Sequence, residues 1–155
     1  LKDPEAIANW PLTLSRDGAR TPMPWIADAP YMGFSTAKPW LPIGEAHRPR
    51  AVDRQEADQA SLLHWTRQVL ALRNASPALR SGPMTFHDLP GDLLAFTRSH
   101  ADQQMLCIFN LGDQPAHWTP DDADHWRPLL TCGDAAPWHF PPASALVAQF
   151  QGSVS

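Results

Sequence analysis

The first 50 residues combine many prolines with many large apolar side chains, and this combination limits how the chain can fold. Eight of the 17 prolines lie in this stretch, and each removes a backbone donor and restricts the residue before it. No continuous helix or central strand is expected there. A disordered linker would not carry so many apolar groups, so we predict either a functional loop or an irregular coat on another domain. Both need a surface to lie on. The apolar residues are Trp10, Leu12, Met23, Trp25, Ile26, Tyr31, Met32, Phe34, Trp40 and Leu41.

A helix is predicted from about residue 58 to residue 74, because apolar residues recur there at three- and four-residue spacing. Asp58 or Ser61 can cap its start, and Pro77 ends the pattern. The apolar stripe is wide and includes a tryptophan, so we expect it to pack against a large surface. The stripe consists of Leu62, Trp65, Val69 and Leu72.

Short extended segments follow Gly82, separated by turn residues about every ten positions. This spacing predicts a small antiparallel sandwich or barrel. The expected strands are 84–89, 93–99, 105–111, 116–119, 126–131 and 145–150.

Composition excludes several classes of function. A formal charge of −4 without a basic cluster argues against nucleic-acid binding. No apolar run reaches the roughly 18 residues of a membrane span, and no leader pattern opens the chain. We therefore predict no membrane partner. Cys107 and Cys132 are expected to be free thiols in a bacterial cytoplasmic protein.

Residues with metal-binding or catalytic chemistry are scattered. None of the seven histidines shares a metal-ligand spacing with another on one element, so we predict no metal site. The acidic run Asp121 to His125 offers oxygens to a hard cation, but such runs are more often solvated turns. Exposed tryptophans can stack on sugar rings. Packing in a core is the better explanation for those of the helix and the strands, which are Trp65, Trp118, Trp126 and Trp138.

One short stretch of the sequence resembles the signature of a known protein family. The residues Ser15 to Trp25, with the sequence SRDGARTPMPW, resemble the G-R-D-x-x-R-T-P-M-x-W signature of the α-glucosidase and oligo-1,6-glucosidase branch of glycoside hydrolase family 13. Residues 33–35 and 39–42 are similar to the family's G-F-[ST] and P-W-[LI] elements. Residues 61–82 resemble the helix that follows its last barrel strand.

The resemblance implies a mixed fold. The chain is expected to begin just after the eighth strand of a (β/α)8 barrel, with the last βα loop and final barrel helix in residues 1–82. An all-β sandwich domain would occupy residues 83–155. The family's catalytic Asp, Glu and third Asp precede the arginine string, so we expect no catalytic residue in this chain and no activity from it alone. The implied partners are an N-terminal barrel chain and an α-glucoside oligosaccharide. We expect no cofactor here, and any structural Ca²⁺ would lie in the barrel.

By the same resemblance, Arg16 is the first candidate for binding substrate, and Arg20 is the second. A guanidinium favours the charged form of a nearby carboxylate nucleophile and can bind sugar hydroxyls in a fork. The alternative role of Arg16 is a structural salt bridge. Arg20 could instead brace the loop by pairing with Asp17 or with a carboxylate of the barrel. Ser15 stands where the family usually has glycine. If that position needs a positive φ, the start of the loop that carries Arg16 would have another conformation here than in the family.

The expected function is thus that of the C-terminal part of a retaining α-glucosidase, which hydrolyses or transfers terminal α-linked glucose. A sister activity, such as a sucrose isomerase, trehalose synthase or transglucosidase, is an alternative that barrel residues would decide. A free-standing sugar-binding β-sandwich is the alternative from a different class. The arginine string and the amphipathic helix argue against it, because such a module needs neither.

Overall fold

The computed structural model describes residues 2–12 and 15–152. The chain forms two compact units, Leu1–Gln68 and Val69–Ser155. The boundary after residue 82, which we placed between the barrel part and the β-sandwich domain, stays a prediction. Within the described residues, no helix combines the length and apolar character needed to cross a membrane.

The first unit consists of short helical turns joined by irregular loops, as its proline content predicts. None of its elements before α3 is longer than six residues, because prolines and extended residues interrupt each turn. They are α1 (Pro4–Asn9), the 3-10 helices η1 (Arg16–Arg20), η2 (Pro30–Gly33) and η3 (Glu45–Arg50), and α2 (Val52–Ala57).

A tight left-handed turn organises the middle of this unit. Tyr31, Met32 and Gly33 all have positive φ, and the Met32 carbonyl accepts hydrogen bonds from the backbone N–H groups of Trp25 and Ile26 at 2.9 and 3.0 Å. A Cβ at Gly33 would lie 3.2 Å from the backbone nitrogen of Ile26. Glycine is therefore required both for its φ of 71° and for the close approach of the two segments.

The predicted helix is confirmed as α3 (Leu62–Ala75). Ser61 is buried and caps the start: its hydroxyl accepts from the His64 N–H at 3.4 Å and donates to the Gln55 carbonyl at 2.7 Å. The apolar stripe is not fully covered. No residue of α3 is buried, and Leu62 is 71% exposed. Trp65 is only half-buried within this chain, and its packing in a core against a larger surface stays a prediction.

In the second unit, α4 (Pro77–Ser81) is fastened to the sheet by polar side chains. The Gln103 side-chain oxygen accepts from the Ser76 hydroxyl at 2.8 Å and from the Ala78 N–H at 3.0 Å. The guanidinium of Arg98 donates to the Leu79 and Gly82 carbonyls. These bonds satisfy carbonyls at the end of α4 that have no partner within the helix.

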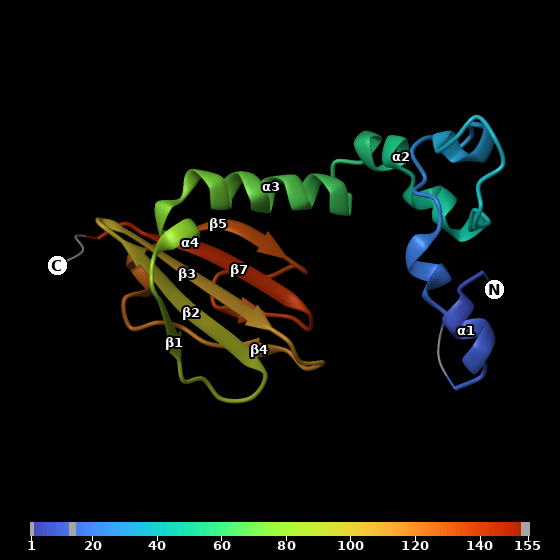
Figure 1. Ribbon diagram of the computed structural model, residues 1–155. Helices are drawn as coiled ribbons and strands as arrows, with labels where there is room; N and C mark the ends of the chain where they lie inside the picture. The colour runs from blue at the N-terminus through green and yellow to red at the C-terminus, as the bar shows by residue number, and fades with distance from the viewer. Residues whose placement is uncertain (1, 13–14, 153–155) are drawn as a thin grey trace. The chain divides into compact units, whose positions relative to one another are not determined.

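Five antiparallel strands form the main sheet in the order β1-β2-β3-β7-β5 (Figure 1). They confirm five of the six predicted segments, and β4 (Ala116–His117) confirms the sixth in shortened form. The sequence did not reveal β6 (His139–Phe140), which pairs with β4, because two residues are too few for an alternating pattern. The main strands are β1 (Met84–His87), β2 (Leu93–His100), β3 (Gln103–Asn110), β5 (Trp126–Cys132) and β7 (Ser144–Phe150).

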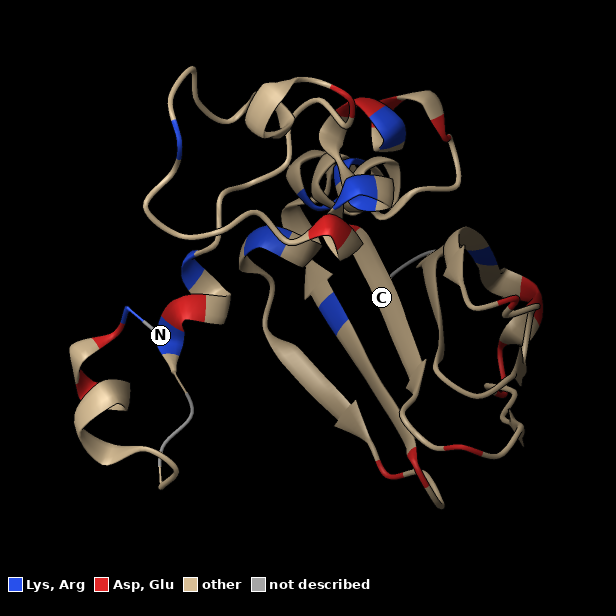
Figure 2. Ribbon diagram, turned by 90° about the vertical axis from the view of Figure 1, so that its right-hand side faces the viewer, with Lys and Arg blue, Asp and Glu red and all other residues tan. Residues whose placement is uncertain are grey.

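The inner face of this sheet and the β4–β6 pair enclose the core. Trp126 belongs to it, and Trp118 and Trp138 pack against it, which confirms the structural interpretation of these tryptophans. The strands carry almost no charge (Figure 2), in keeping with this role. The buried members are Leu93, Ala95, Leu106, Ile108, Trp126, Ala135, Phe140, Leu146 and Ala148.

Both cysteines are free, as expected. Cys107 is buried in β3, and this burial raises the pKa of its thiol to about 11. The thiol therefore stays protonated and unreactive at neutral pH.

A single buried side chain joins β3 to the segment that carries β6. Asn110 is 2% exposed. Its amide donates to the carbonyls of Gln114, Phe140 and Pro141 at 2.8 to 3.0 Å, and its carbonyl oxygen accepts from the Gly112 N–H at 3.0 Å. Replacement by an apolar residue would strand several buried backbone groups at once.

We therefore predict that Asn110→Ala lowers the free energy of unfolding of the second unit by about 2–4 kcal/mol, since each unsatisfied buried group costs about 1–3 kcal/mol. Urea unfolding followed through amide signals of β3 and β7 measures the change. Asn74→Ala, at an exposed position of α3, is the matched control and should change stability by less than about 0.5 kcal/mol. Equal unfolding midpoints for the two variants would contradict this role of Asn110.

Candidate functional site

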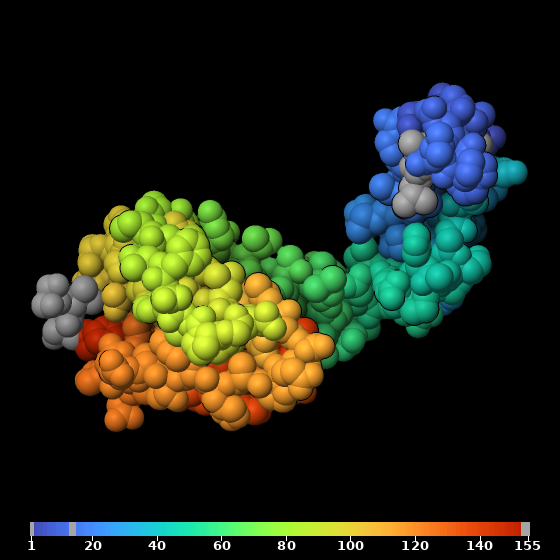
Figure 3. All heavy atoms as spheres, turned by 90° about the horizontal axis from the view of Figure 1, so that it is seen from below, coloured from blue at the N-terminus to red at the C-terminus, as the bar shows by residue number. Residues whose placement is uncertain are grey.

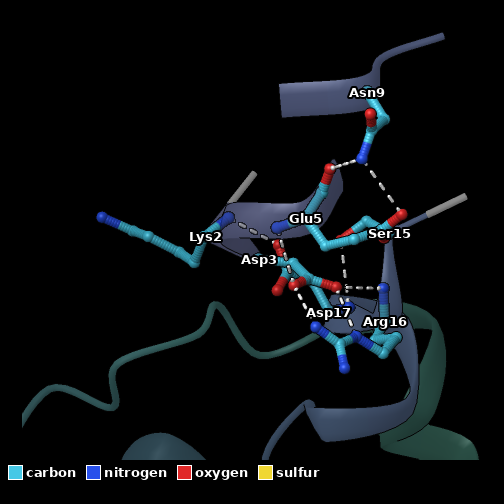
Figure 4. A network of polar contacts seen from close by, with 7 residues as sticks. All are labelled: Lys2, Asp3, Glu5, Asn9, Ser15, Arg16 and Asp17. Atoms are coloured by element: carbon cyan, nitrogen blue, oxygen red, sulfur yellow. Dashed lines mark hydrogen bonds and ion pairs between the residues drawn. The ribbon is translucent and has the colours of Figure 1, made fainter. Parts of the chain in front are cut away.

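Asp3 holds the arginine string through Arg16, which lies 13 positions later in the sequence. Asp3 precedes α1 and caps it: one carboxylate oxygen accepts from the Glu5 N–H at 3.4 Å. The same carboxylate accepts from Arg16 Nε at 2.8 Å, from Arg16 Nη2 at 2.7 Å and from the Arg16 backbone N–H at 3.0 Å. Figure 4 shows the carboxylate and the guanidinium side by side. The N-terminal helix and the arginine turn are thus locked together by one bidentate pair.

The two partners of this pair differ in burial. The Asp3 side chain is completely buried, whereas the Arg16 side chain is 60% exposed. The hydrogen bonds from Arg16 hold the pKa of Asp3 far below the ordinary range of an aspartate, against the opposing effect of burial. Asp3 in turn raises the pKa of Arg16. Both groups therefore stay charged throughout the physiological range of pH.

Asp17 completes the network, a role that the sequence analysis did not assign to it. Its Oδ2 accepts from the Lys2 N–H at 2.6 Å, and this bond is the main reason why the pKa of Asp17 is lowered. Its Oδ1 is buried and has no hydrogen-bond partner among the described residues. The signal in the sequence was an acidic residue placed between two arginines in one short turn.

The structure treats the two predicted arginines differently. Arg16 joins the network of Figure 4, whereas Arg20 is exposed at the end of η1 and forms no ion pair with any described residue. The bracing of Arg20 by Asp17, which we considered as an alternative, is not seen in the described part of the chain.

Ser15 does not need the conformation of a glycine. Its φ and ψ are −60° and 140°, which is extended backbone, and its hydroxyl accepts from the Asp17 N–H at 3.0 Å to cap η1. Serine is a good capping residue in this position. The entrance of the arginine turn is therefore formed without a positive φ at this residue.

A second concave site lies within the second unit. A cavity of about 490 Å³ opens between the sheet and residues 118–122. Trp118 and Trp126 form part of its wall, and polar groups of His87, Thr97 and Gln104 line the sheet side. Its size lies within the range of small-molecule sites, about 300–1,000 Å³.

No group of three or more potential metal ligands was found among residues 2–12 and 15–152. The acidic run at 121–125 forms a 3-10 turn, and Asp122 there accepts a hydrogen bond from Trp126 Nε1 at 2.8 Å. The carboxylate thus has a structural partner, in line with the interpretation of this run as a turn.

Comparison with known proteins shows one consistent set of relatives. Residues 1–82 match the model of the alpha-amylase family, described as alpha amylase, catalytic domain. The chain is 50% identical over 116 residues to a probable alpha-glucosidase of Rhizobium meliloti. The aligned region covers 75% of this chain and 21% of the relative. A probable oligo-1,6-glucosidase of Bacillus subtilis is 35% identical over 103 residues, or 65% of this chain and 18% of that protein.

Solved structures give the same result. The alpha-glucosyl transfer enzyme XgtA matches 97% of this chain and 29% of its own, with a TM-score of 0.82 and 38% identity. The trehalulose synthase MutB of Pseudomonas mesoacidophila matches 94% of this chain and 27% of its own, with a TM-score of 0.76 and 29% identity. The chain spans about a fifth of the curated relatives and less than a third of these structures.

The Asp3–Arg16 pair makes the stability of the fold depend on pH in the acid range. A lowered pKa in the folded state stabilises the fold above the ordinary pKa of an aspartate, and the stabilisation is lost as the pH falls through the folded value. In Arg16→Gln the main cause of the lowered pKa is gone, while burial and the backbone hydrogen bonds from Arg16 and Glu5 remain, so we expect the pKa of Asp3 to rise. Carboxyl-carbon NMR titration measures it. An unchanged titration of Asp3 would contradict the pairing.

Proposed function

Because this chain belongs to the alpha-amylase family, glycoside hydrolase family 13, we propose that it supplies the last active-site loop and the C-terminal β domain of a retaining α-glucosidase. In this proposal the enzyme acts on terminal α-linked glucose of oligosaccharides. The nucleophile, the acid/base and the third carboxylate come from a barrel formed by an N-terminal polypeptide.

The observation that carries the proposal is the state of Arg16. Asp3 occupies its Nε and Nη2 atoms, while Nη1 has no partner among the described residues and most of the side chain is exposed. A buried carboxylate that orients an arginine leaves the free edge of the guanidinium in a fixed direction. Such a fixed, charged donor suits a sugar hydroxyl or a carboxylate nucleophile.

The chemistry explains why a fixed guanidinium is useful. Retaining glycosidases need one carboxylate that stays ionised in order to attack the anomeric carbon. A nearby positive charge favours that ionised form.

The apolar surface of the first unit supports a barrel partner. Large side chains that would normally be buried are 39–63% exposed in this chain, and Trp10 and Trp40 are 62% and 63% exposed. Complete burial of such a side chain contributes about 1.5–3 kcal/mol. A barrel face would cover them at the side where its βα loops form an active site. The residues are Trp10, Trp25, Ile26, Tyr31, Phe34 and Trp40.

The proposal is tested with a chimera, in which this chain replaces the matching C-terminal part of the Rhizobium meliloti relative. We expect the chimera to hydrolyse p-nitrophenyl α-glucoside and the 155-residue chain alone to be inactive. Product analysis with maltose and isomaltose then separates hydrolysis from transfer and one linkage from the other. Hydrolysis by the chain alone, or a folded chimera without activity, would contradict the proposal.

Variants of the chimera test the role of Arg16. Arg16→Ala should lower kcat/KM by about 100-fold, comparable with the loss of one preorganised donor. Arg50→Ala, at an exposed arginine of the same unit without an ion pair to any described residue, should leave kcat/KM unchanged. Asp3→Asn keeps the arginine but removes its charged partner, so it should give an intermediate loss. Equal kcat/KM in Arg16→Ala and Arg50→Ala would exclude a contact with substrate.

A second candidate function, sugar binding without catalysis, is favoured by the cavity of the second unit. Its two tryptophans and its hydrogen-bonding side chains are the groups that bind sugar rings and hydroxyls. Under this function the chain alone would bind maltose.

Calorimetric titration of the chain with maltose distinguishes this second function. Trp118→Ala removes a wall of the cavity, and Trp138→Ala is its control, because Trp138 packs against the same core but does not line the cavity. If the cavity binds sugar, only Trp118→Ala should weaken binding, by about tenfold for one stacking tryptophan. No binding, or equal loss in both variants, would remove this candidate.

A further inference from the structure

The main sheet of the second unit is apolar on both of its faces. Residues 93–96 of β2, 105–109 of β3 and 145–148 of β7 are continuous apolar runs. Such runs are typical of strands that are covered on both sides, whereas a sheet with one face in water alternates apolar and polar residues. The β4–β6 pair covers the inner face. The opposite, outer face therefore needs a cover as well.

The helix α4 covers one end of the outer face. Arg98 points to that face from β2, because its neighbours along the strand face the core. Its guanidinium donates to the Leu79 carbonyl at 2.6 Å and to the Gly82 carbonyl at 2.7 Å. Met105, the register partner of Arg98, and Ala78 of α4 are both completely buried. This end of the outer face is thus closed.

The rest of the outer face carries three phenylalanines in contact with one another. Phe86 and Phe96 are register partners with ring centroids 5.9 Å apart, and Phe96 lies 6.0 Å from Phe109. Phe86 is 63% exposed, and Leu94, the register partner of Phe109, is also exposed. The strand β1 and the turn after it, yellow-green in Figure 3, lie at the surface of the second unit. We call these four residues the phenylalanine patch.

The phenylalanine patch continues a contact that the catalytic-domain part of the chain already makes. The match to the alpha amylase catalytic domain ends at residue 82, so α4, which lies on the outer face, belongs to this match. Only Pro83 separates the match from β1, which carries Phe86. In the two curated relatives, the region that matches this chain is 21% and 18% of the protein. Most of such an enzyme therefore lies outside the matched region.

We propose that the phenylalanine patch is the docking site for the N-terminal barrel, whose outer helices would pack apolar side chains against the three rings. A barrel of this kind carries its helices in an outer ring, and a layer of helices commonly covers an apolar sheet face. The inference rests on the proposed function, because it takes the barrel of that enzyme as the partner.

The chemistry and position of the patch favour this partner. The patch contains no charged side chain, and the guanidinium of Arg98 at its border is already engaged by α4, so the partner surface must be apolar. Because α4 belongs to the catalytic domain and lies on the same face, the rest of that domain is held at a high effective concentration. A second copy of the chain does not have this advantage.

Hydroxyl-radical footprinting read by mass spectrometry tests the proposal, by comparing the 155-residue chain alone with the chimera described above. Oxidation of Phe86, Phe96 and Phe109 should be at least about fivefold slower in the chimera, because a close-packed contact excludes water. Trp138 is the internal control. It packs against the core from the other side of the sheet, so its oxidation should be equal in both proteins.

A pair of substitutions in β1 tests the direction of the contact. Phe86→Asp places a charge in the patch, and burial of an unpaired charge is unfavourable, so oxidation of Phe96 and Phe109 in the chimera should rise by at least about threefold. Thr85→Asp is the matched control, because Thr85 is exposed on the same strand but points to the other side of the sheet. It should retain the protection. Equal urea midpoints of the two variant chains alone show that both are folded.

Equal oxidation of the three phenylalanines in the chain alone and in an active chimera would overturn the docking site and leave the proposed function intact. Protection in a folded but inactive chimera would support the docking site and contradict the proposed function. Protection in the chain alone that increases with its concentration would assign the patch to a second copy and overturn the proposal. Equal loss of protection in Phe86→Asp and Thr85→Asp would also overturn it.

Discussion

The Asp3 carboxylate is completely buried, and its charge is balanced only by Arg16 among the described residues. A buried, unpaired carboxylate is strongly unfavourable, so the first turn of the chain and the arginine turn must fold together. The cap of α1, the direction of the guanidinium and the position of Asp17 all follow from this pair. It also reconciles the two roles considered for Arg16, because a bidentate ion pair leaves part of the guanidinium free for another ligand.

The two units obtain their stability in different ways. The second unit has a continuous apolar core between its sheets, together with polar links such as Asn110 and Gln103 that fasten turns to strands. The first unit has a few short helical turns and a large exposed apolar surface. Its order rests on backbone hydrogen bonds, for example those to Met32, and on charged pairs. This contrast agrees with the proposal that the first unit forms part of an active-site face.

Family membership accounts for this difference. The alpha-amylase catalytic domain matches residues 1–82, where most of the exposed large apolar side chains lie, and the relatives include hydrolases and glucosyl-transferring enzymes. One scaffold therefore serves several outcomes of glucosyl transfer. In the proposed function, the arginine turn would provide charge and orientation, which are needed whether water or a sugar accepts the glucosyl group.

The sequence by itself determined the features that depend on local pattern. Short extended segments between turn residues predicted β2, β3, β5 and β7 closely, three- and four-residue spacing predicted α3, and the string from Ser15 to Trp25 identified the family. Only the tertiary structure decided which distant residues meet. Asp3 reaches Arg16 across 13 positions, and His117 faces His139 across 22. Such pairs depend on turn geometry and strand register, which bring together side chains that no periodicity of the sequence connects.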